Sequence, residues 1–278
     1  MPTDPPRPPS RERPPPPAAT VALRSLARLV VPVSCAGCGL DDVPLCDRCG
    51  AAFDGAPWRA EADAPRLDRL DGVPPLPVWA LGVCTGSTRE TVVAWKDRDR
   101  ADLDRVLGTA VRRAAVALAP DLRAASAGRV TVVPAPSSPG SRRRRGREPT
   151  AVLAAAVADG LRSAGVPAAV AGALVRRRRT ADQAGLSARA RGANLLGAVA
   201  VRRRYRAAVP SAGTCLLVDD VLTTGATLAA AERVLEAADA AVVGALVLAA
   251  TPPPGTVTPS ARDAGDASGS PDGHRGLA

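Results

Sequence analysis

One segment in the last third of the chain constrains the fold more than any other. Residues 215–228 read CLLVDDVLTTGATL, an apolar run that ends in two carboxylates and continues into a turn of Thr, Gly and Ala. A short continuous apolar run is typical of a strand buried on both faces, as in parallel sheets covered by helices. A helix is expected to begin near Leu228. The segment therefore predicts the strand, loop and helix of an α/β fold.

The turn in this segment has the composition of a phosphate cradle. Small and hydroxyl-bearing residues leave backbone N–H groups free to converge on a phosphate, and the dipole of the following helix favours negative charge there. We expect Gly225 to let the backbone approach a ligand closely. The predicted phosphate-binding residues are Thr223, Thr224, Gly225, Ala226 and Thr227.

The adjacent carboxylates of Asp219 and Asp220 would repel the same phosphate, so we expect them to serve a neighbouring group. Ribose hydroxyls fit, because carboxylates accept hydrogen bonds from the 2- and 3-hydroxyls. Near a sugar, carboxylates also favour positive charge that develops at the anomeric carbon. Asp219 and Asp220 are therefore the predicted ribose contacts.

Other kinds of protein can carry a similar segment. A phosphoaccepting receiver domain also presents paired aspartates after an apolar strand, but it needs several further strand-helix units, and only one strand candidate follows here. A P-loop is excluded for this segment because no G-x-x-x-x-G-K-[ST] pattern occurs in it. A plain surface turn remains as the simplest alternative.

The rest of the chain alternates between strand-like and helix-like stretches, which predicts a parallel sheet with helices on its faces. The strand candidates are Val78 to Cys84, Val130 to Pro134, Cys215 to Asp219 and Val242 to Ala250, and the helix candidates are Ala101 to Leu118, Thr150 to Ala164 and Thr227 to Ala238. We divide the chain into a Pro- and Arg-rich disordered tail (1–20), an amphipathic helix with a cysteine module (21–77), the main domain (78–250) and a second disordered tail (251–278).

Four of the six cysteines form two C-x-x-C pairs with seven residues between them. Such spacing lets four thiolates face one ion, and Zn²⁺ in a closed four-sulfur site is structural rather than catalytic. Two disulfides are the alternative, which suits a secreted protein better than an intracellular one. The predicted ligands are Cys35, Cys38, Cys46 and Cys49. Cys84 and Cys215 lie in apolar runs and are expected in the core.

Composition narrows the class of protein. A formal net charge of +10 points to an anionic partner, and both nucleic acid and phosphorylated small molecules qualify, although the arginine clusters could equally be solvated surface. No apolar run is long enough for a membrane span, and residues 1–20 lack a secretion signal pattern. We therefore expect a soluble, cytoplasmic protein.

The segment LLVDDVLTTGATL resembles the thirteen-residue phosphoribosyl pyrophosphate motif of type I phosphoribosyltransferases. The four-cysteine module, Trp95-Lys96 with Arg98 and Arg100, VVPAPSS, and LVRRRRTADQAGLSARARGAN together resemble the ComF family of competence-associated proteins. The resemblance implies a type I phosphoribosyltransferase fold with a small zinc-ribbon-like module before it.

By this resemblance, Asp219 and Asp220 would contact ribose, and Thr223 to Thr227 would hold the 5-phosphate. The loop of Pro136 and Ser137 would face the pyrophosphate, with further contacts expected from Arg145, Arg176 and Arg178, then Thr180, Gln183, Arg191 and Asn194. Where relatives commonly read Arg-Gly-Phe-Asn-Gln, residues 145–149 read RGREP, which puts the contacts of the last three positions in question.

The expected reaction is displacement of pyrophosphate by a nitrogen nucleophile, with Mg²⁺ bridging pyrophosphate and ribose. The only histidine, His274, lies in the predicted C-terminal tail, and the sequence indicates no general base. The alternatives are a nucleobase-salvage enzyme and a non-catalytic module that binds a phosphoribosyl ligand or single-stranded DNA beside the DNA-uptake machinery. Only three Trp, one Tyr and one Phe are present, which argues against an aromatic stacking surface for single strands.

Overall fold

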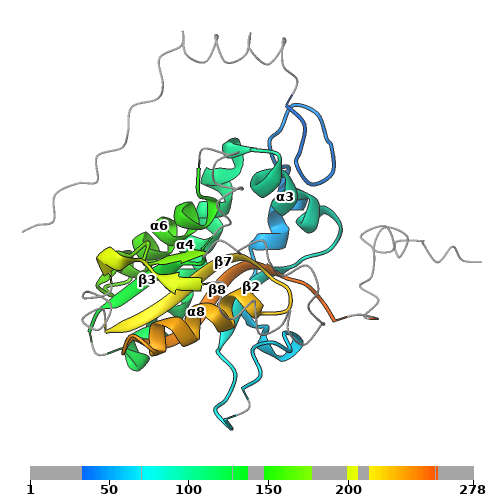
Figure 1. Cartoon of the computed structure of the whole chain (residues 1–278). Helices are drawn as coiled ribbons and strands as arrows, with labels where there is room; N and C mark the ends of the chain where they lie inside the picture. Colours follow the sequence, from blue (N-terminus) through cyan, green and yellow to red (C-terminus); the bar gives the residue numbers. More distant parts are fainter. Residues whose placement is uncertain are drawn as a thin grey trace, which may run out of the picture.

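The computed structural model describes residues 33–69, 71–126, 128–136, 147–176, 199–205, 213–253 and 255. Within them the chain forms an α/β fold in which helices cover both faces of a mostly parallel sheet (Figure 1). The predicted fold class is thereby confirmed. The tail at 1–20, the helix expected from Val21 and nearly all of the tail at 251–278 lie outside the described residues.

The sheet has six strands in the order β1-β2-β8-β7-β3-β4. The central strands β7 and β8 are the longest, and only β1 is antiparallel to its neighbour in the sheet. The strands are β1 (Trp58–Arg59), β2 (Val78–Val83), β3 (Val130–Pro134), β4 (Ala168–Val170), β7 (Thr214–Leu222) and β8 (Ala241–Ala250). Because β7 lies between β8 and β3, its loops occupy the middle of the sheet edge.

Each face of the sheet has its own apolar core. Helices α4 (Asp104–Ala125) and α6 (Pro149–Ser163) pack on the face of β7 that presents Leu216 and Val218. Helix α8 (Ala226–Glu236) packs on the opposite face, which presents Leu217 (Figure 1). Burial of both faces explains why β8, and β7 from Cys215 to Val218, are continuously apolar rather than alternating.

The remaining elements lie around this frame. Helix α3 (Gly86–Asp97) follows β2 and reaches the core through the fully buried Trp95. A two-stranded sheet, β5 (Leu174–Arg176) with β6 (Val199–Val201), packs on the α8 side. The short elements are α2 (Asp47–Gly50) and the 3-10 turns η1 (Ala51–Phe53), η2 (Glu61–Asp63), η3 (Ala101–Leu103) and η4 (Arg203–Tyr205).

The order of the strands indicates where on the sheet edge a ligand site is expected. The connection from β3 leads outward to β4, whereas the connection from β7 leads in the opposite direction to β8. In open parallel sheets, the carboxyl ends of two neighbouring strands whose connections diverge flank a crevice where ligands bind. Here the loops after β3 and β7 flank that position.

The predicted strands agree with the structure within a few residues, but three helix and core predictions need correction. Helix α3 was not expected, because Thr88, Thr91, Val92 and Val93 are β-branched and weak helix formers. Helix α4 continues past Pro120 to Ala125, since burial of Leu122 offsets the lost hydrogen bond.

Cys215 is buried as expected, but the prediction of a core position for Cys84 is wrong. Cys84 follows the last residue of β2 and is half-buried, because the chain leaves the sheet there, at the edge that carries the charged side chains.

The segment between the cysteines and β2 is well packed, although its sequence shows no periodicity. Ala60, Ala64, Leu67 and Leu76 are buried in the core on the α8 face. The proposed boundary near Pro77 stays a prediction. No helix in the described part of the chain is long and apolar enough to cross a membrane.

Candidate functional site

The two acids of the motif lie in the second half of β7, which continues beyond the predicted end at Asp219 to Leu222. The Asp220 side chain is 6% exposed, and Asp219 is half-buried. The Asp220 amide donates a hydrogen bond to the Asp219 carboxylate at 2.9 Å. The neighbouring strand β8 extends just as far along the edge, so the acids stand at its centre.

Asp220 forms an ion pair with Lys96 near the end of α3. The lysine Nζ lies 2.6 Å from Oδ2 and 2.8 Å from Oδ1 of Asp220. Burial alone would lower the pKa of Lys96, but the charge of Asp220 and this hydrogen bond raise it above its ordinary value. The sequence indicates Lys96 only as part of a family pattern. That it is the only lysine of the chain is the signal that could have identified it as a site residue.

Asp219 has a different electrostatic environment. Burial, followed by the nearby charge of Asp220, raises the pKa of Asp219 to about 7. The charges of Lys96 and Arg176 and the hydrogen bond from the Asp220 amide act in the opposite direction. The two neighbouring carboxylates are therefore not equivalent: one is held in an ion pair, and the other exchanges a proton near neutral pH.

The loop from Thr223 to Thr227 borders a small polar cavity of about 40 Å³ at the start of α8. Thr223 and Thr224 are exposed, whereas Ala226 and Thr227 are half-buried. The first N–H groups of an α-helix have no acceptor within the helix, so those of α8 are available to an anion in this cavity. These N–H groups and the exposed threonine hydroxyls are donors that could face an anion, and the phosphate site at this turn stays a prediction.

Gly225 is required in this loop for a reason that the sequence did not reveal. It caps α8 in the left-handed conformation at φ 79°, and a Cβ atom at this position would lie 2.5 Å from Cγ of Leu67. The Arg66 amide also donates a hydrogen bond to the Thr224 carbonyl at 3.0 Å. The segment before β2 thus packs against the loop and supports it.

The loop after β3 lies beside the motif. The Ala135 amide donates to the Val218 carbonyl at 2.8 Å, and the Thr150 hydroxyl at the start of α6 donates to the Ala135 carbonyl at 3.1 Å. These bonds bring the half-buried Pro136 to the same edge as Asp219. Of the other predicted contacts, Arg176 ends β5 near enough to affect Asp219.

Several predicted contacts lie outside the described residues. These are Ser137, Arg145, Arg178, Thr180, Gln183, Arg191 and Asn194.

Arg147, where the chain departs from the pattern of the family that it resembles, binds other parts of the scaffold. Its guanidinium donates to Asp99, Asp104 and the Trp95 carbonyl, and it lies 5.7 Å from the centre of the Trp95 ring. Two residues later, Pro149 begins α6, where a proline is well tolerated. Arg147 therefore joins α3 to α4.

The four predicted metal ligands come together in a second site. Their sulfur atoms all lie within 4.8 Å of one another, and Cys46 Sγ lies 3.7 Å from the sulfurs of Cys35 and Cys38. A tetrahedral ion with Zn–S bonds of the usual length separates its sulfurs by about 3.8 Å, whereas a disulfide needs about 2.05 Å. The cluster can hold a metal ion such as zinc, and its geometry does not fit two disulfides.

Hydrogen bonds within this cluster favour the thiolate form of Cys35, whereas burial and hydrogen bonds with the other three cysteines raise the pKa of Cys49. Burial opposes the ionisation of Cys35, but hydrogen bonds, first among them one from the Cys46 amide to Cys35 Sγ at 3.3 Å, lower its pKa to about 6. Thiolates are the ligands that bind zinc.

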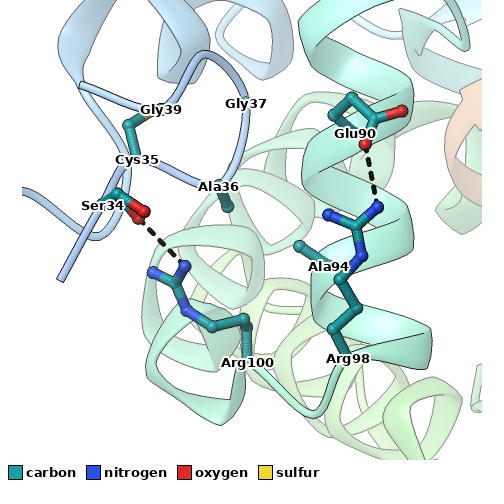
Figure 2. A pocket seen from close by; sticks show the side chains of 9 residues that line it. All are labelled: Ser34, Cys35, Ala36, Gly37, Gly39, Glu90, Ala94, Arg98 and Arg100. Carbon is teal, nitrogen blue, oxygen red and sulfur yellow. Dashed lines mark hydrogen bonds and ion pairs between the residues drawn. The ribbon is translucent and has the colours of Figure 1, made fainter. Parts of the chain in front are cut away.

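The cysteine module is docked onto α3 and the turn that follows it. Arg100 donates to the backbone carbonyls of Ser34 at 2.9 Å and Pro44 at 3.2 Å, and Figure 2 shows its guanidinium turned toward Ser34. A hollow of about 320 Å³ separates the module from α3 here. The arginines that line it, Arg98 and Arg100, are paired with Glu90 and Asp102 respectively.

Comparison with known families agrees with this geometry. The sequence model of the phosphoribosyl transferase domain matches residues 150–263, which include β7, the acid pair, the loop and α8. The chain carries a phosphoribosyl transferase domain. No match was found among curated proteins. The four-cysteine module and α3 precede the matched region, so the phosphoribosyl transferase domain is accompanied by a metal-binding cluster near the N-terminus.

Proposed function

We propose that this phosphoribosyl transferase domain binds phosphoribosyl pyrophosphate together with Mg²⁺. One arrangement carries the proposal: a carboxylate pair and a phosphate-accepting helix start lie side by side at the sheet edge where the strand connections diverge. The 5-phosphate would occupy the cavity at the start of α8, and the ribose hydroxyls would reach Asp219 and Asp220. The pyrophosphate would then face the loop after β3 and Arg176.

The acid pair suits a ligand that brings a cation. Two carboxylates beside a phosphate cradle would repel a bare polyanion, and Lys96 balances only part of their charge. Asp219 and Asp220 would hold the Mg²⁺ that arrives with the ligand, and this ion would offset the charge of the leaving pyrophosphate. The residues of the chain would hold the ribose and the 5-phosphate in place while a nitrogen nucleophile displaces pyrophosphate from the anomeric carbon.

Calorimetric titration with phosphoribosyl pyrophosphate and Mg²⁺ tests this site. We expect the wild type to bind, and the combined Asp219→Ala and Asp220→Ala variant to lose at least about tenfold in affinity, since two acceptors of charge-assisted hydrogen bonds are gone. Asp121→Asn, an exposed carboxylate on α4, is the matched control. Equal affinity of wild type and double variant would refute the assignment. Pyrophosphate release in a screen of nucleobase acceptors then tests for transfer.

The cellular role that we propose is DNA uptake, and the resemblance to the ComF family supports it. A role in competence would bring the protein near single-stranded DNA. Binding of an oligonucleotide at several salt concentrations tests direct contact, because neutralisation of backbone phosphates makes affinity fall steeply with salt. A flat response would remove the DNA-contact part of the proposal and leave the small-molecule site in place.

For the four-cysteine cluster we propose a structural Zn²⁺. Sulfur separations that match a tetrahedral ion support the assignment, and four thiolates leave no open position for chemistry. Elemental analysis of the purified protein is expected to find one zinc per chain. An absence of zinc combined with an absence of free thiols would overturn the assignment.

A further inference from the structure

The only lysine of the chain lies in the candidate site. Of 37 lysine and arginine residues, 36 are arginine, and the single exception, Lys96, pairs with the most buried acid of the motif. Arginine carries the same charge but as a wide planar fork, whereas the lysine ammonium is compact. Because the composition is so strongly biased toward arginine, we look for the reason for a lysine here in its contacts with neighbouring side chains.

The rest of α3 holds Lys96 rigidly. Trp95, the preceding residue, is fully buried and donates from its ring nitrogen to Asp104 at 2.6 Å. The Trp95 carbonyl accepts a hydrogen bond from Arg147. The end of α3 is therefore held by Asp104 through the Trp95 ring and by Arg147 through the Trp95 carbonyl. These contacts position the Lys96 ammonium group beside Asp220.

Several charged or titratable groups act on the pair. Asp219 and Asp220 of β7 and Asp97 of α3 raise the pKa of Lys96, and Arg176 of β5 acts on Asp219. The half-buried thiol of Cys84, at the end of β2, is close enough to be affected by Lys96, Asp220 and Arg89. Lys96 makes the direct contact with Asp220 and also influences Asp219.

We propose that Lys96 is a positioning residue for ligand binding: it fixes the Asp220 carboxylate and supplies the counter-charge that lets both acids of the motif accept ribose hydroxyls. The proposal rests on the proposed function of this site. Lys96 does not itself contact the ligand in this scheme. It acts through the carboxylates, and its removal should therefore change how binding depends on pH.

Titrations of the full chain with phosphoribosyl pyrophosphate and Mg²⁺ from pH 6 to 9 test the proposal. For the wild type we expect affinity to rise with pH through about 7, where Asp219 loses its proton. In Lys96→Met the midpoint should move up by about one unit, with about a fivefold loss of affinity at pH 7, because a nearby cation that favours the carboxylate is gone. Lys96→Arg should keep the wild-type midpoint, since it keeps the charge.

Arg89→Met, which removes an exposed cation from the same helix, is the matched control and should leave the profile unchanged. If Lys96→Met loses affinity equally at every pH, or retains the wild-type profile, the positioning role is wrong. If the wild type itself binds nothing at any pH, the proposed function fails, and this outcome is distinct from a failure of the role of Lys96.

A second measurement observes the lysine directly and does not depend on the ligand. Metabolic labelling with lysine carrying ¹³C at Cε produces one side-chain signal, which belongs to Lys96 because no other lysine exists. We expect this signal to shift in Asp220→Asn and to titrate at lower pH there than in the wild type. An unchanged signal and titration in Asp220→Asn would show that the ion pair does not form and would overturn the proposal.

Discussion

At the scale of single residues, Asp219 is expected to bind the ligand as a charged carboxylate, but that charge destabilises the folded chain. It is half-buried beside a second carboxylate, and its pKa is raised to about 7 from an ordinary value of 3.8. Between these two values the folded chain holds a proton that the unfolded chain has released. Retention of this proton adds to the free energy of unfolding. This contribution is fully present below about pH 4 and is lost as the pH rises through about 7.

Asp219→Asn should therefore change stability and binding in opposite directions. The free energy of unfolding at pH 8 is expected to increase by on the order of 2 kcal/mol, because the variant never carries the unfavourable charge. Affinity for phosphoribosyl pyrophosphate should fall. Urea denaturation at pH 5 and pH 8 measures the first effect, with Asp121→Asn as control. A stabilisation equal at both pH values would contradict this account of Asp219.

Gly225 allows a second test at this scale. Gly225→Ala places a methyl group against Leu67 and forces alanine into the left-handed region, so we expect a loss of roughly 1 to 3 kcal/mol in unfolding free energy. Gly55→Ala, where a Cβ atom meets nothing within 4 Å, is the matched control. Thermal unfolding of both variants is the measurement, and equal melting temperatures would contradict the role of Leu67 behind the loop.

At the scale of elements, α3 joins three parts of the molecule. Its first half contacts the cysteine module: a Cβ atom on Gly37 would lie 2.9 Å from the Thr91 hydroxyl. Its last turn brings Trp95 into the core and Lys96 to Asp220. Arg147 then ties this turn to the start of α4. The orientation of the lysine thus depends on contacts made outside the motif.

Arg147→Met should weaken this junction. The substitution removes the guanidinium that donates to Asp99, Asp104 and the Trp95 carbonyl, and we expect a loss of about 2 kcal/mol in unfolding free energy. Arg105→Met, on an exposed position of α4, should change stability by less than about 0.5 kcal/mol. Chemical denaturation separates the two variants. A neutral Arg147→Met would mean that the junction is held by packing of Trp95 alone.

At the scale of the whole molecule, the cysteine cluster and the sheet share one core. Cys49 is 1% exposed, and Phe53, four residues later, is 2% exposed in the same cluster as Trp95, Leu216 and Val218. Arg100 adds hydrogen bonds between the module and the turn after α3. Metal binding at the four cysteines should therefore stabilise more than the module itself.

Chelation of the metal is expected to lower the melting temperature of the entire domain and not only to release its N-terminal part. Cys38→Ser, at an exposed ligand, should reproduce the effect, whereas Cys84→Ser, outside the cluster, should not. Calorimetry with and without chelator, read together with near-ultraviolet circular dichroism of the tryptophans, is the measurement. An unchanged transition of the sheet domain would show that the module folds independently of it.

The sequence alone determined the parts that depend on local pattern. Apolar runs predicted β3 with both ends correct and β7 and β8 within a few residues, because strands buried on both faces must be apolar along their length. Cysteine spacing predicted the metal cluster, since the four sulfurs lie close together along the chain. The acids and the threonine-glycine loop could likewise be found without a structure.

Only the tertiary structure decided what supports these groups. Lys96 is 124 residues from Asp220, and Leu67 is far from Gly225 along the chain, so no local pattern relates them. Their contacts exist because parallel strands connected through helices bring distant segments to one edge of the sheet. The chemistry of the loop is thus local, whereas the charge balance of its acids and the support of its glycine arise from packing between distant parts of the chain.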